Sequence, residues 1–411
     1  MVASPGRFGI SSSRGAMPDR RHVALVTNTG WSMVRYRGEL INGLLERGWR
    51  VSAIADFSEQ DIEHLRRLGV DPIRVAIEAA GRSPLRDLGY LVRLARVLRA
   101  LRPDVVHNFS IKPVIYGSLA ARLAGVPGIV GSVTGGGILR AGEQGGLQRV
   151  LRPLYRLALR GRPAVVFQNR DDLELFVGDG LVERARTVYI AGSGVDTAAL
   201  APDPSVPPEA RTCFVMACRM LWSKGVADFV EAARMVKPRH PHASFVLFGG
   251  SAEDYGSKNP DFIPKSWLDE LDREGIVTWR GFTAPAVIEA AMRSAAAVVL
   301  PSSYAEGVPR ALIEAAAAGA PIITTDAPGC RDTVIDQVSG FLCPLHAPAA
   351  LAEAMARLLG DPQLIAQMAR ESRALAIARF DRNIVVEQTV KIYEQQLMRI
   401  TNKGAGRLAG E

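Results

Sequence analysis

The sequence predicts an α/β protein in which two tandem Rossmann-like domains face a central cleft. Three observations support this prediction: short apolar runs alternate with helical segments, the alternation occurs twice, and a proline-rich stretch separates the two series. Strands that alternate with helices are typical of parallel sheets covered by helices on both faces. At 411 residues the chain can also hold two cores of about 200 residues each.

The first series forms the predicted N-terminal domain, residues 22–198. Its expected strands cover residues 22–30, 50–56, 72–77, 104–110, 128–135 and 164–169, and its expected helices cover 35–49, 58–69, 84–101, 117–125 and 147–160. Residues 1–21 are rich in Gly, Ser and Arg and lack the apolar stretch of a secretory signal, so we expect a disordered leader.

We interpret the proline-rich stretch at residues 199–212, ALAPDPSVPPEART, as the linker between the domains. The C-terminal domain is then expected at residues 213–380, with strands in 212–219, 243–250, 277–282, 297–303 and 321–326, and helices at 225–237, 264–275, 285–295 and from about Val308. A helical tail runs from about residue 348 to 400. We expect its last part, 381–400, to pack back towards the N-terminal domain, and residues 401–411 to be disordered.

Composition excludes several classes of protein. Hydrophobic content of 48% and charged content of 22% are ordinary for a globular protein, and no run of about eighteen apolar residues predicts a membrane span. The four cysteines stand singly, which favours a reducing cytoplasm. The net charge of +8 is uneven, since residues 1–196 hold 28 Lys and Arg against 18 Asp and Glu, and the rest hold 22 against 24.

Two carboxylates stand out in the stretch YAEGVPRALIEAAAAG, residues 304–319. Glu306 falls in a strand-to-helix loop, Pro309 suits the first position of the following helix, and Glu314 lies about a turn and a half inside it. Between them lie free backbone N–H groups at the helix start, which together with the helix dipole favour a phosphate. The alternative is a solvated loop glutamate and an exposed helix glutamate.

Two cations follow the first strand of the second domain. Arg219 and Lys224, in RMLWSKG, stand in a loop at the carboxyl end of that strand, where they could clamp a diphosphate. Taken alone, such a pair could equally be surface charges. The glutamate loop is expected on the same edge of the sheet, which favours a shared site.

These motifs resemble the retaining glycosyltransferases of family 4, which have the GT-B fold. The resemblance runs from about His22 to about Ile400 and rests on the E-x7-E element, ACRMLWSKG, VYIAGSGVDTAAL and QNRDDLELF. It implies that Arg219 and Lys224 hold the donor diphosphate, that Glu306 contacts the donor hexose and that Glu314 binds the ribose. Further donor contacts are implied at Gly307, Val308, Pro309, Arg310 and Ala311, at Phe282 and Thr283 for the base, and at Gly30, Thr134, Gly135 and Gly136 in the first domain.

The chain departs from the family at one position. Many members carry a histidine that touches the donor sugar where this sequence has Thr134. His107, at the end of an expected strand, is another candidate for the cleft, although a hydrogen-bonded structural role is the alternative. The chain has no D-x-D pair, so we expect neither a metal ion nor a cofactor, the nucleotide-sugar donor being a substrate. The mechanism that the family implies retains the anomeric configuration, and the leaving phosphate takes the proton.

Two basic helical segments, 84–101 and 147–160, mix leucines with arginines. They are typical of helices that lie on an anionic membrane, although solvated arginines above core leucines would give the same pattern. The stretches RMLWSKG and HNFSIKPVIYGSLAARLAG further resemble bacterial enzymes that add an N-acetylhexosamine to undecaprenyl-diphosphate-linked sugars. The resemblance implies a UDP-sugar donor, a lipid-linked saccharide acceptor and a place on the cytoplasmic face of the plasma membrane.

Other functions remain as alternatives. A UDP-sugar 2-epimerase shares the two-domain plan, and a non-catalytic basic membrane-binding protein would explain the first half alone. A dinucleotide-dependent oxidoreductase is disfavoured because the first strand ends in TNTGWSMVRYRG, without G-x-G-x-x-G. Nucleic-acid binding would leave Glu306, Glu314 and the cationic loop unexplained, so we expect no nucleic acid as a partner.

Overall fold

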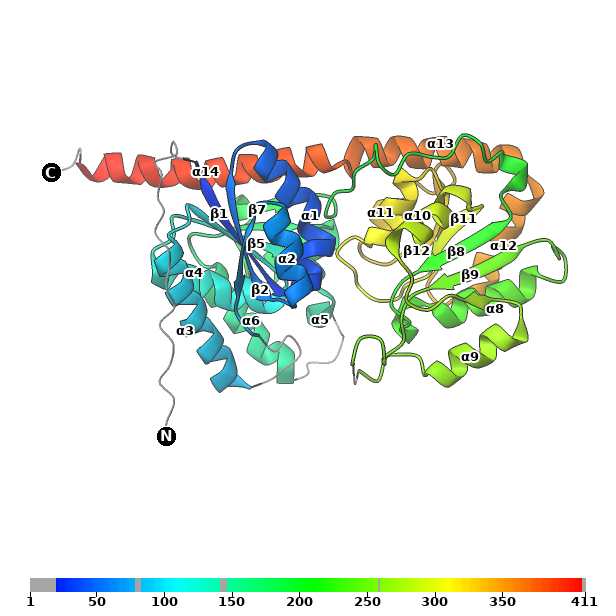
Figure 1. Ribbon diagram of the computed structural model, residues 1–411, viewed down its shortest axis with the longest axis horizontal. Coiled ribbons are helices and arrows are strands. Elements are labelled where there is room, and N and C mark those ends of the chain that lie inside the picture. Colours follow the sequence, from blue (N-terminus) through cyan, green and yellow to red (C-terminus); the bar gives the residue numbers. More distant parts are fainter. Residues whose placement is uncertain (1–19, 78–82, 141–145, 258, 409–411) are drawn as a thin grey trace.

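The computed structural model describes residues 20–77, 83–140, 146–257 and 259–408. It shows two lobes side by side, each with a central sheet between helices, and a pair of long helices that runs along both lobes (Figure 1). Two α/β domains with parallel sheets confirm the predicted fold class. The expected disordered leader lies outside the described residues as far as residue 19.

The N-terminal domain has a seven-stranded parallel sheet in the order β3-β2-β1-β4-β5-β6-β7. Its strands are β1 His22–Thr29, β2 Arg50–Asp56, β3 Asp71–Arg74, β4 Val105–Phe109, β5 Gly128–Val133, β6 Ala164–Phe167 and β7 Thr187–Tyr189. Its α-helices are α1 Gly30–Glu46, α2 Glu59–Arg67, α3 Pro84–Leu101, α4 Ser118–Ala124, α5 Gly137–Arg140, α6 Gly146–Leu159 and α7 Arg170–Gly178, with short helical turns at Pro113–Gly117 and Arg184–Arg186. Helix α1 packs on one face of the sheet, and α3 and α4 pack on the other.

The C-terminal domain has a six-stranded parallel sheet in the order β10-β9-β8-β11-β12-β13. Its strands are β8 Cys213–Ala217, β9 Ser244–Phe248, β10 Thr278–Trp279, β11 Ala297–Leu300, β12 Ile322–Thr325 and β13 Gly340–Cys343. Its helices are α8 Val226–Val236, α9 Lys265–Glu274, α10 Pro285–Ser294, α11 Arg310–Ala317, α12 Pro348–Gly360 and α13 Pro362–Arg379, with short 3-10 turns at Pro208–Ala210, Trp222–Lys224 and Arg331–Thr333. Both sheets switch strand order beside their first strand, where ligands bind in folds of this kind.

The expected helical tail is three helices. Asp361 breaks it and caps α13, because its side chain accepts hydrogen bonds from the backbone of Gln363 and Leu364. Helix α14, Arg382–Leu408, then returns to the N-terminal domain, where Val386 and Tyr393 are buried in the core. Because α14 continues to Leu408, the expectation of a disordered tail from residue 401 is wrong for residues 401–408, and 409–411 lie outside the described residues.

Candidate active site

A cavity of about 260 Å³ lies between the two domains. It is built at the carboxyl ends of parallel strands of both sheets, together with one face of α1 and the start of α11. Its lining comprises Ser32, Tyr36, Arg37, Ser110, Thr134, Gln168 and Ser193 from the N-terminal domain, and Ala217, Cys218, Arg219, Lys224, Leu300 and the run from Glu306 to Ala311 from the C-terminal domain. The structure therefore brings the predicted cationic loop and the predicted glutamate loop into one site.

Lys224 and Glu306 form an ion pair in this cavity. Both side chains are largely buried, at 10% and 15% exposure. Burial lowers the pKa of the Lys224 ammonium to about 8, and the nearby charge of Arg219 acts in the same direction. The backbone can turn tightly here because Gly225 adopts φ +78°, and a Cβ there would lie 2.1 Å from the carbonyl oxygen of Pro301. The loop thus holds a buried cation against the carboxylate of the neighbouring loop.

Glu314 is buried at 4% exposure, so it is not the exposed helix glutamate of the alternative interpretation. Its Oε1 accepts from Arg310 Nε of the same helix at 2.7 Å and lies 2.8 Å from Nη2 of Arg35 on α1, so the Arg35 ion pair crosses between the domains. Helix α11 begins at Arg310, two positions after the expected start at Val308, and Pro309 precedes its first turn. Ribose binding by Glu314 would therefore compete with two guanidinium groups.

The glutamate loop is held from the other domain by Asn169. Its Nδ2 donates to the carbonyl oxygens of Glu306 and Gly307 at 2.8 and 2.9 Å, while its Oδ1 caps α7 by accepting from the backbone of Asp172 at 2.7 Å. Gly307 has no room for a side chain, since a Cβ would lie 2.3 Å from Oε1 of Gln168. The sequence pointed to QNRDDLELF only through a resemblance, and this contact between domains was not predicted.

Several predicted site residues lie outside the cavity lining. Gly30 packs against Phe57 and Asp61, with no room for a Cβ, while Gly135 and Gly136 pack between the glutamate loop and Asp172. Phe282 and Thr283 follow β10, and Phe282 is exposed. The structure therefore gives Gly135 and Gly136 a packing role at the loop.

His107 is a buried structural residue. Its two ring nitrogens lie 2.7 Å from the hydroxyls of Tyr393 and Ser132, so both are hydrogen-bonded. Burial lowers the pKa of His107 well below its usual value, which keeps the ring neutral. The predicted role of His107 at the cavity is wrong, because the ring is used to join α14 to the sheet.

The cavity also contains Arg37, which sequence reasoning missed. Arg37 is on the face of α1 that carries Met33, Leu40 and Ile41, all buried. A charged residue in register with an apolar helix face was the available signal. The same face turns Arg37 towards the cavity. Among the described residues of the lining, Arg37, Arg219, Lys224 and Arg310 give four cationic side chains and Glu306 gives one carboxylate.

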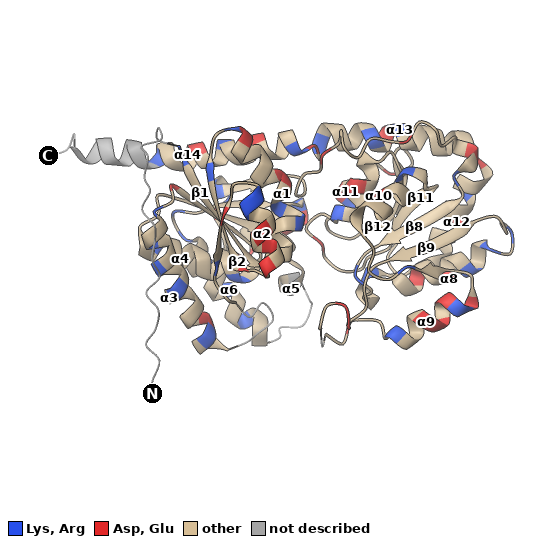
Figure 2. Ribbon diagram, viewed as in Figure 1, with Lys and Arg blue, Asp and Glu red and all other residues tan. Residues whose placement is uncertain are grey.

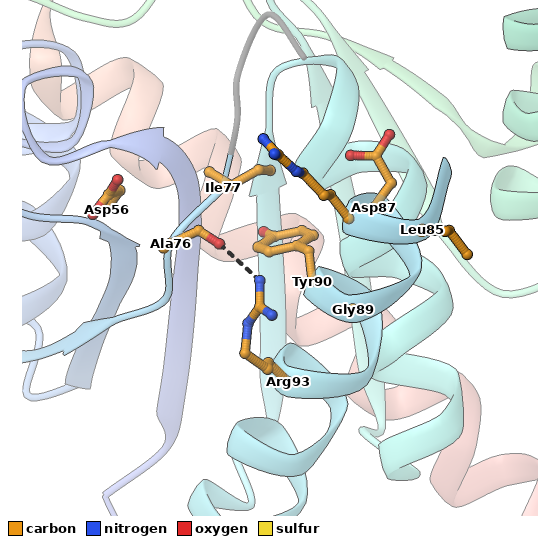
Figure 3. Close-up of a pocket in the computed structure, with 9 residues that line it drawn as sticks. Asp56, Ala76, Ile77, Leu85, Asp87, Gly89, Tyr90 and Arg93 are labelled. Atoms are coloured by element: carbon orange, nitrogen blue, oxygen red, sulfur yellow. Dashed lines mark hydrogen bonds between the residues drawn. The ribbon is translucent and has the colours of Figure 1, made fainter. Parts of the chain in front are cut away.

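A second cavity, of about 590 Å³, lies beside the start of α3. Figure 3 shows the Tyr90 ring beside the hydrogen bond in which Arg93 Nη2 donates to the carbonyl oxygen of Ala76 at 3.2 Å. The Tyr90 hydroxyl is buried and has no hydrogen-bond partner in the described part of the chain. Asp56, Arg86 and Asp87 also line this cavity, so its walls carry both signs of charge.

Within the described ranges, no helix is both long and apolar enough to cross a membrane. In the same ranges, no cluster of three or more His, Cys, Asp or Glu side chains is arranged to hold a metal ion. Whether the reaction needs a metal ion is a separate question, and metal independence stays a prediction.

Two family models match the chain, one for each domain. The model described as a glycosyl transferase 4-like domain matches residues 33–193, and the model described as glycosyl transferases group 1 matches residues 201–375. The boundary between the two matches falls at the start of the predicted linker.

Two relatives with similar sequences are named as transferases of undecaprenyl-diphosphate-linked sugars. The chain is 28% identical over 393 residues, covering 92% of its length and 100% of the relative, to N,N'-diacetylbacillosaminyl-diphospho-undecaprenol alpha-1,3-N-acetylgalactosaminyltransferase of Campylobacter jejuni. It is 25% identical over 332 residues, 78% of its length and 82% of the relative, to UDP-Gal:alpha-D-GlcNAc-diphosphoundecaprenol alpha-1,3-galactosyltransferase of Escherichia coli.

Solved structures share the fold. The crystal structure of HepE of Anabaena in complex with UDP and glucose matches with a TM-score of 0.74 and 19% identity, over 92% of this chain and 100% of that one. A glycosyltransferase of Rickettsia africae matches with a TM-score of 0.74 and 18% identity, over 92% of this chain and 99% of that one. These matches confirm the predicted GT-B architecture.

Proposed function

Because this chain belongs to the glycosyltransferases of the GT-B fold, we propose that it moves a hexose or N-acetylhexosamine from a UDP-sugar to a polyprenyl-diphosphate-linked saccharide. Such a step belongs to the assembly of cell-surface polysaccharides or glycans. The names of the two relatives above, both transferases acting on undecaprenyl-diphosphate-linked sugars, support the acceptor class. The UDP complex of HepE supports the donor class.

One observation carries the proposal: in the described part of the chain, the lining of the cavity between the domains has four cationic side chains and one carboxylate. A nucleotide diphosphate is a ligand of the opposite charge. Arg219 and Lys224 face the cavity from the loop after β8, and the backbone N–H groups at the start of α11 face it from the other side. The donor diphosphate binds between them without Mg²⁺ or any other cofactor, since fixed cations neutralise its charge.

The ion pair between Lys224 and Glu306 gives these two residues linked roles. A phosphate oxygen of the donor competes with Glu306 for the Lys224 ammonium. The carboxylate released in this way lies beside the donor hexose. The acceptor oxygen then bonds to the anomeric carbon on the face that the diphosphate leaves, the bond from that carbon to the phosphate oxygen breaks, and the acceptor proton moves to the leaving phosphate. The protein mainly positions the reactants and neutralises charge.

We further propose that the N-terminal domain, which would bind the acceptor, lies against an anionic membrane surface on the cytoplasmic face of the plasma membrane. Helix α3 exposes Leu85, Leu88 and Val92 beside the exposed Arg86 and Arg96, and Figure 2 shows the basic residues along it. Exposed leucines next to arginines fit the boundary between lipid headgroups and acyl chains. Each basic residue near an anionic surface contributes about 1 kcal/mol. The cavity of Figure 3 opens beside the same helix, where a lipid-linked acceptor would arrive.

The test is a panel of UDP- and GDP-sugars, each offered with and without a short-chain polyprenyl-diphosphate saccharide and followed by mass spectrometry. We expect a UDP-sugar to be consumed only with the acceptor, with the sugar added to it in the α configuration. Anionic vesicles should raise the rate more than neutral ones, and chelator should leave it unchanged. Conversion of the UDP-sugar without acceptor would instead favour the epimerase.

The same assay tests the cavity through Lys224→Ala and Glu306→Ala. Each should lower the rate of transfer by roughly 100-fold or more, since each removes a group placed against developing charge. Lys265→Ala is the matched control, because Lys265 pairs with Asp269 on the exposed face of α9. Near-normal transfer by either cavity variant would count against this site.

A further inference from the structure

Arg37 is a buried cation with no ionic partner. Its exposure is 7%, and within the described residues it makes no ion pair or hydrogen bond, its Nε being buried and unsatisfied. Its guanidinium lies 4.1 Å from the centre of the Phe109 ring, which fixes one of its faces. The side chain lines both the cavity between the domains and a cavity of about 20 Å³ behind it.

The other cations of the cavity differ from Arg37. Lys224 is paired with Glu306, and Arg310 with Glu314. Arg219 has no ion-pair partner in the described ranges, but it is exposed, so water solvates its charge. A charge that is both buried and unpaired is strongly disfavoured unless a ligand compensates it. Among the described residues, each domain therefore gives the cavity one cation without an ionic partner, Arg37 or Arg219. Only Arg37, from the N-terminal domain, is also buried, so its charge is the one that costs stability.

We propose that Arg37 binds oxygens of a diphosphate in the cavity, opposite Arg219, so that the N-terminal domain completes the anion site. This inference rests on the proposed function and gives a specific role to Arg37, which that function counts only as one of four cations around the cavity. Two substrates carry the required chemistry, the UDP-sugar donor and the lipid diphosphate acceptor. The same guanidinium could meet either one, and the experiment separates them.

The surroundings suit this role. The stacked Phe109 ring occupies one face of the guanidinium and leaves its edge donors for a phosphate. Burial lowers the pKa of Arg37 to about 9, and the nearby Arg310 charge adds to the effect, so an anion bound against the guanidinium would offset the cost of burying its charge. A cation in a site with little water acts strongly on the charge that develops on a leaving diphosphate.

The test compares Arg37→Met and Arg37→Lys with Arg211→Met. Methionine keeps most of the side-chain volume and removes the charge, and lysine keeps the charge without the planar fork. Arg211 is the matched control because it is also 7% exposed but donates through Nη1 to the carbonyl oxygen of Gly319 at 3.2 Å, away from the cavity.

Calorimetric titrations with UDP, UMP and uridine test the donor arm. Arg37→Met should bind UDP roughly 10- to 100-fold more weakly than the unaltered protein, with uridine affinity unchanged and partial recovery in Arg37→Lys. The acceptor arm measures KM for the short-chain lipid diphosphate saccharide. If Arg37→Met raises only the KM for the acceptor, the inference holds and the diphosphate that Arg37 binds is that of the acceptor. If Arg37→Met and the unaltered protein have the same UDP affinity and the same KM for the acceptor, the inference is overturned.

Thermal unfolding without ligand excludes a merely structural role. Arg37→Met should melt at the same temperature as the unaltered protein or higher, since it removes an uncompensated buried charge, whereas Arg211→Met should melt lower. A large fall in melting temperature for Arg37→Met would overturn the inference. If the unaltered protein binds neither UDP nor the acceptor, the proposed function fails with it. Normal binding that is indifferent to Arg37 overturns this inference alone.

Discussion

Burial determines which histidine rings of this protein can take up a proton. The ring of His107 is enclosed by Tyr393 and Ser132, and burial keeps its pKa well below the usual 6.5. His22 follows the same pattern, with its pKa lowered by burial to about 4. Both rings stay neutral in the folded protein at pH values where the unfolded chain would protonate them.

This difference predicts that stability falls in acid. Below about pH 6.5 the unfolded state binds protons that the folded state does not, so the free energy of unfolding decreases as the pH decreases. His107 and His22 should both contribute to this loss, since burial lowers the pKa of each ring in the folded state. Urea denaturation of His107→Gln should show lower stability at neutral pH, by about 1–3 kcal/mol, and a shallower pH dependence. His64→Gln, at an exposed position of α2, is the control, and parallel pH profiles for His107→Gln and the unaltered protein would contradict the account.

The sequence allowed some residues of the candidate site to be predicted, but not the partners with which they pair. Arg219, Lys224 and Glu306 could be singled out because charged residues beside turn signals at strand ends are unusual enough to notice. The ion pairs of Lys224 with Glu306 and of Glu314 with Arg35 could not be predicted, since each joins segments that are distant in the chain. His107 was misassigned because a strand-end position does not show that Tyr393, far along the chain, covers it.

At the scale of the elements, the conformation of the loop between β11 and α11 depends on contacts with the N-terminal domain. Asn169 contributes two hydrogen bonds to its backbone, each worth about 1 kcal/mol, and the close approach of Gly136 to Asp172 leaves no space for a side chain. The loop conformation that places Glu306 is thus set by the N-terminal domain.

Asn169→Ser should separate the two roles of Asn169. Serine still caps α7 but is too short to donate to the loop, so the rate of transfer at saturating substrate should fall about tenfold with only a small loss of stability. Asp361→Ala removes the cap of α13, far from the cavity, and should reduce stability without this loss of rate. If the rate of transfer falls only in proportion to the loss of stability in both variants, Asn169 does not position the loop.

Element prediction succeeded where the periodic signal was long. The helix expected at 84–101 is α3 with the same limits, because proline opens it and a long apolar stripe continues it. Strands β7 and β13, of three and four residues at the edges of their sheets, were not predicted. The predicted tail helix ran through Asp361 because a cap inside a helical pattern is a weak signal.

Across the whole molecule, several connections join the lobes, among them the ion pair between Arg331 and Asp171, and three others bear on the cavity. Arg35 reaches Glu314, Asn169 holds the glutamate loop, and α13 is followed directly by α14, which packs on the other lobe (Figure 1). All three converge around the cavity or span it. The two-domain plan was predictable from the repeated alternation and the proline-rich linker, whereas the sequence could not show how closely the cleft residues of the two domains approach.

A structure of the protein with bound UDP is the most direct test of the cationic cavity. We expect the diphosphate to lie between the two lobes, within hydrogen-bond distance of Arg219 and Lys224, with the Lys224 to Glu306 ion pair opened. A diphosphate bound elsewhere, or one that leaves both cations turned towards solvent, would contradict the account.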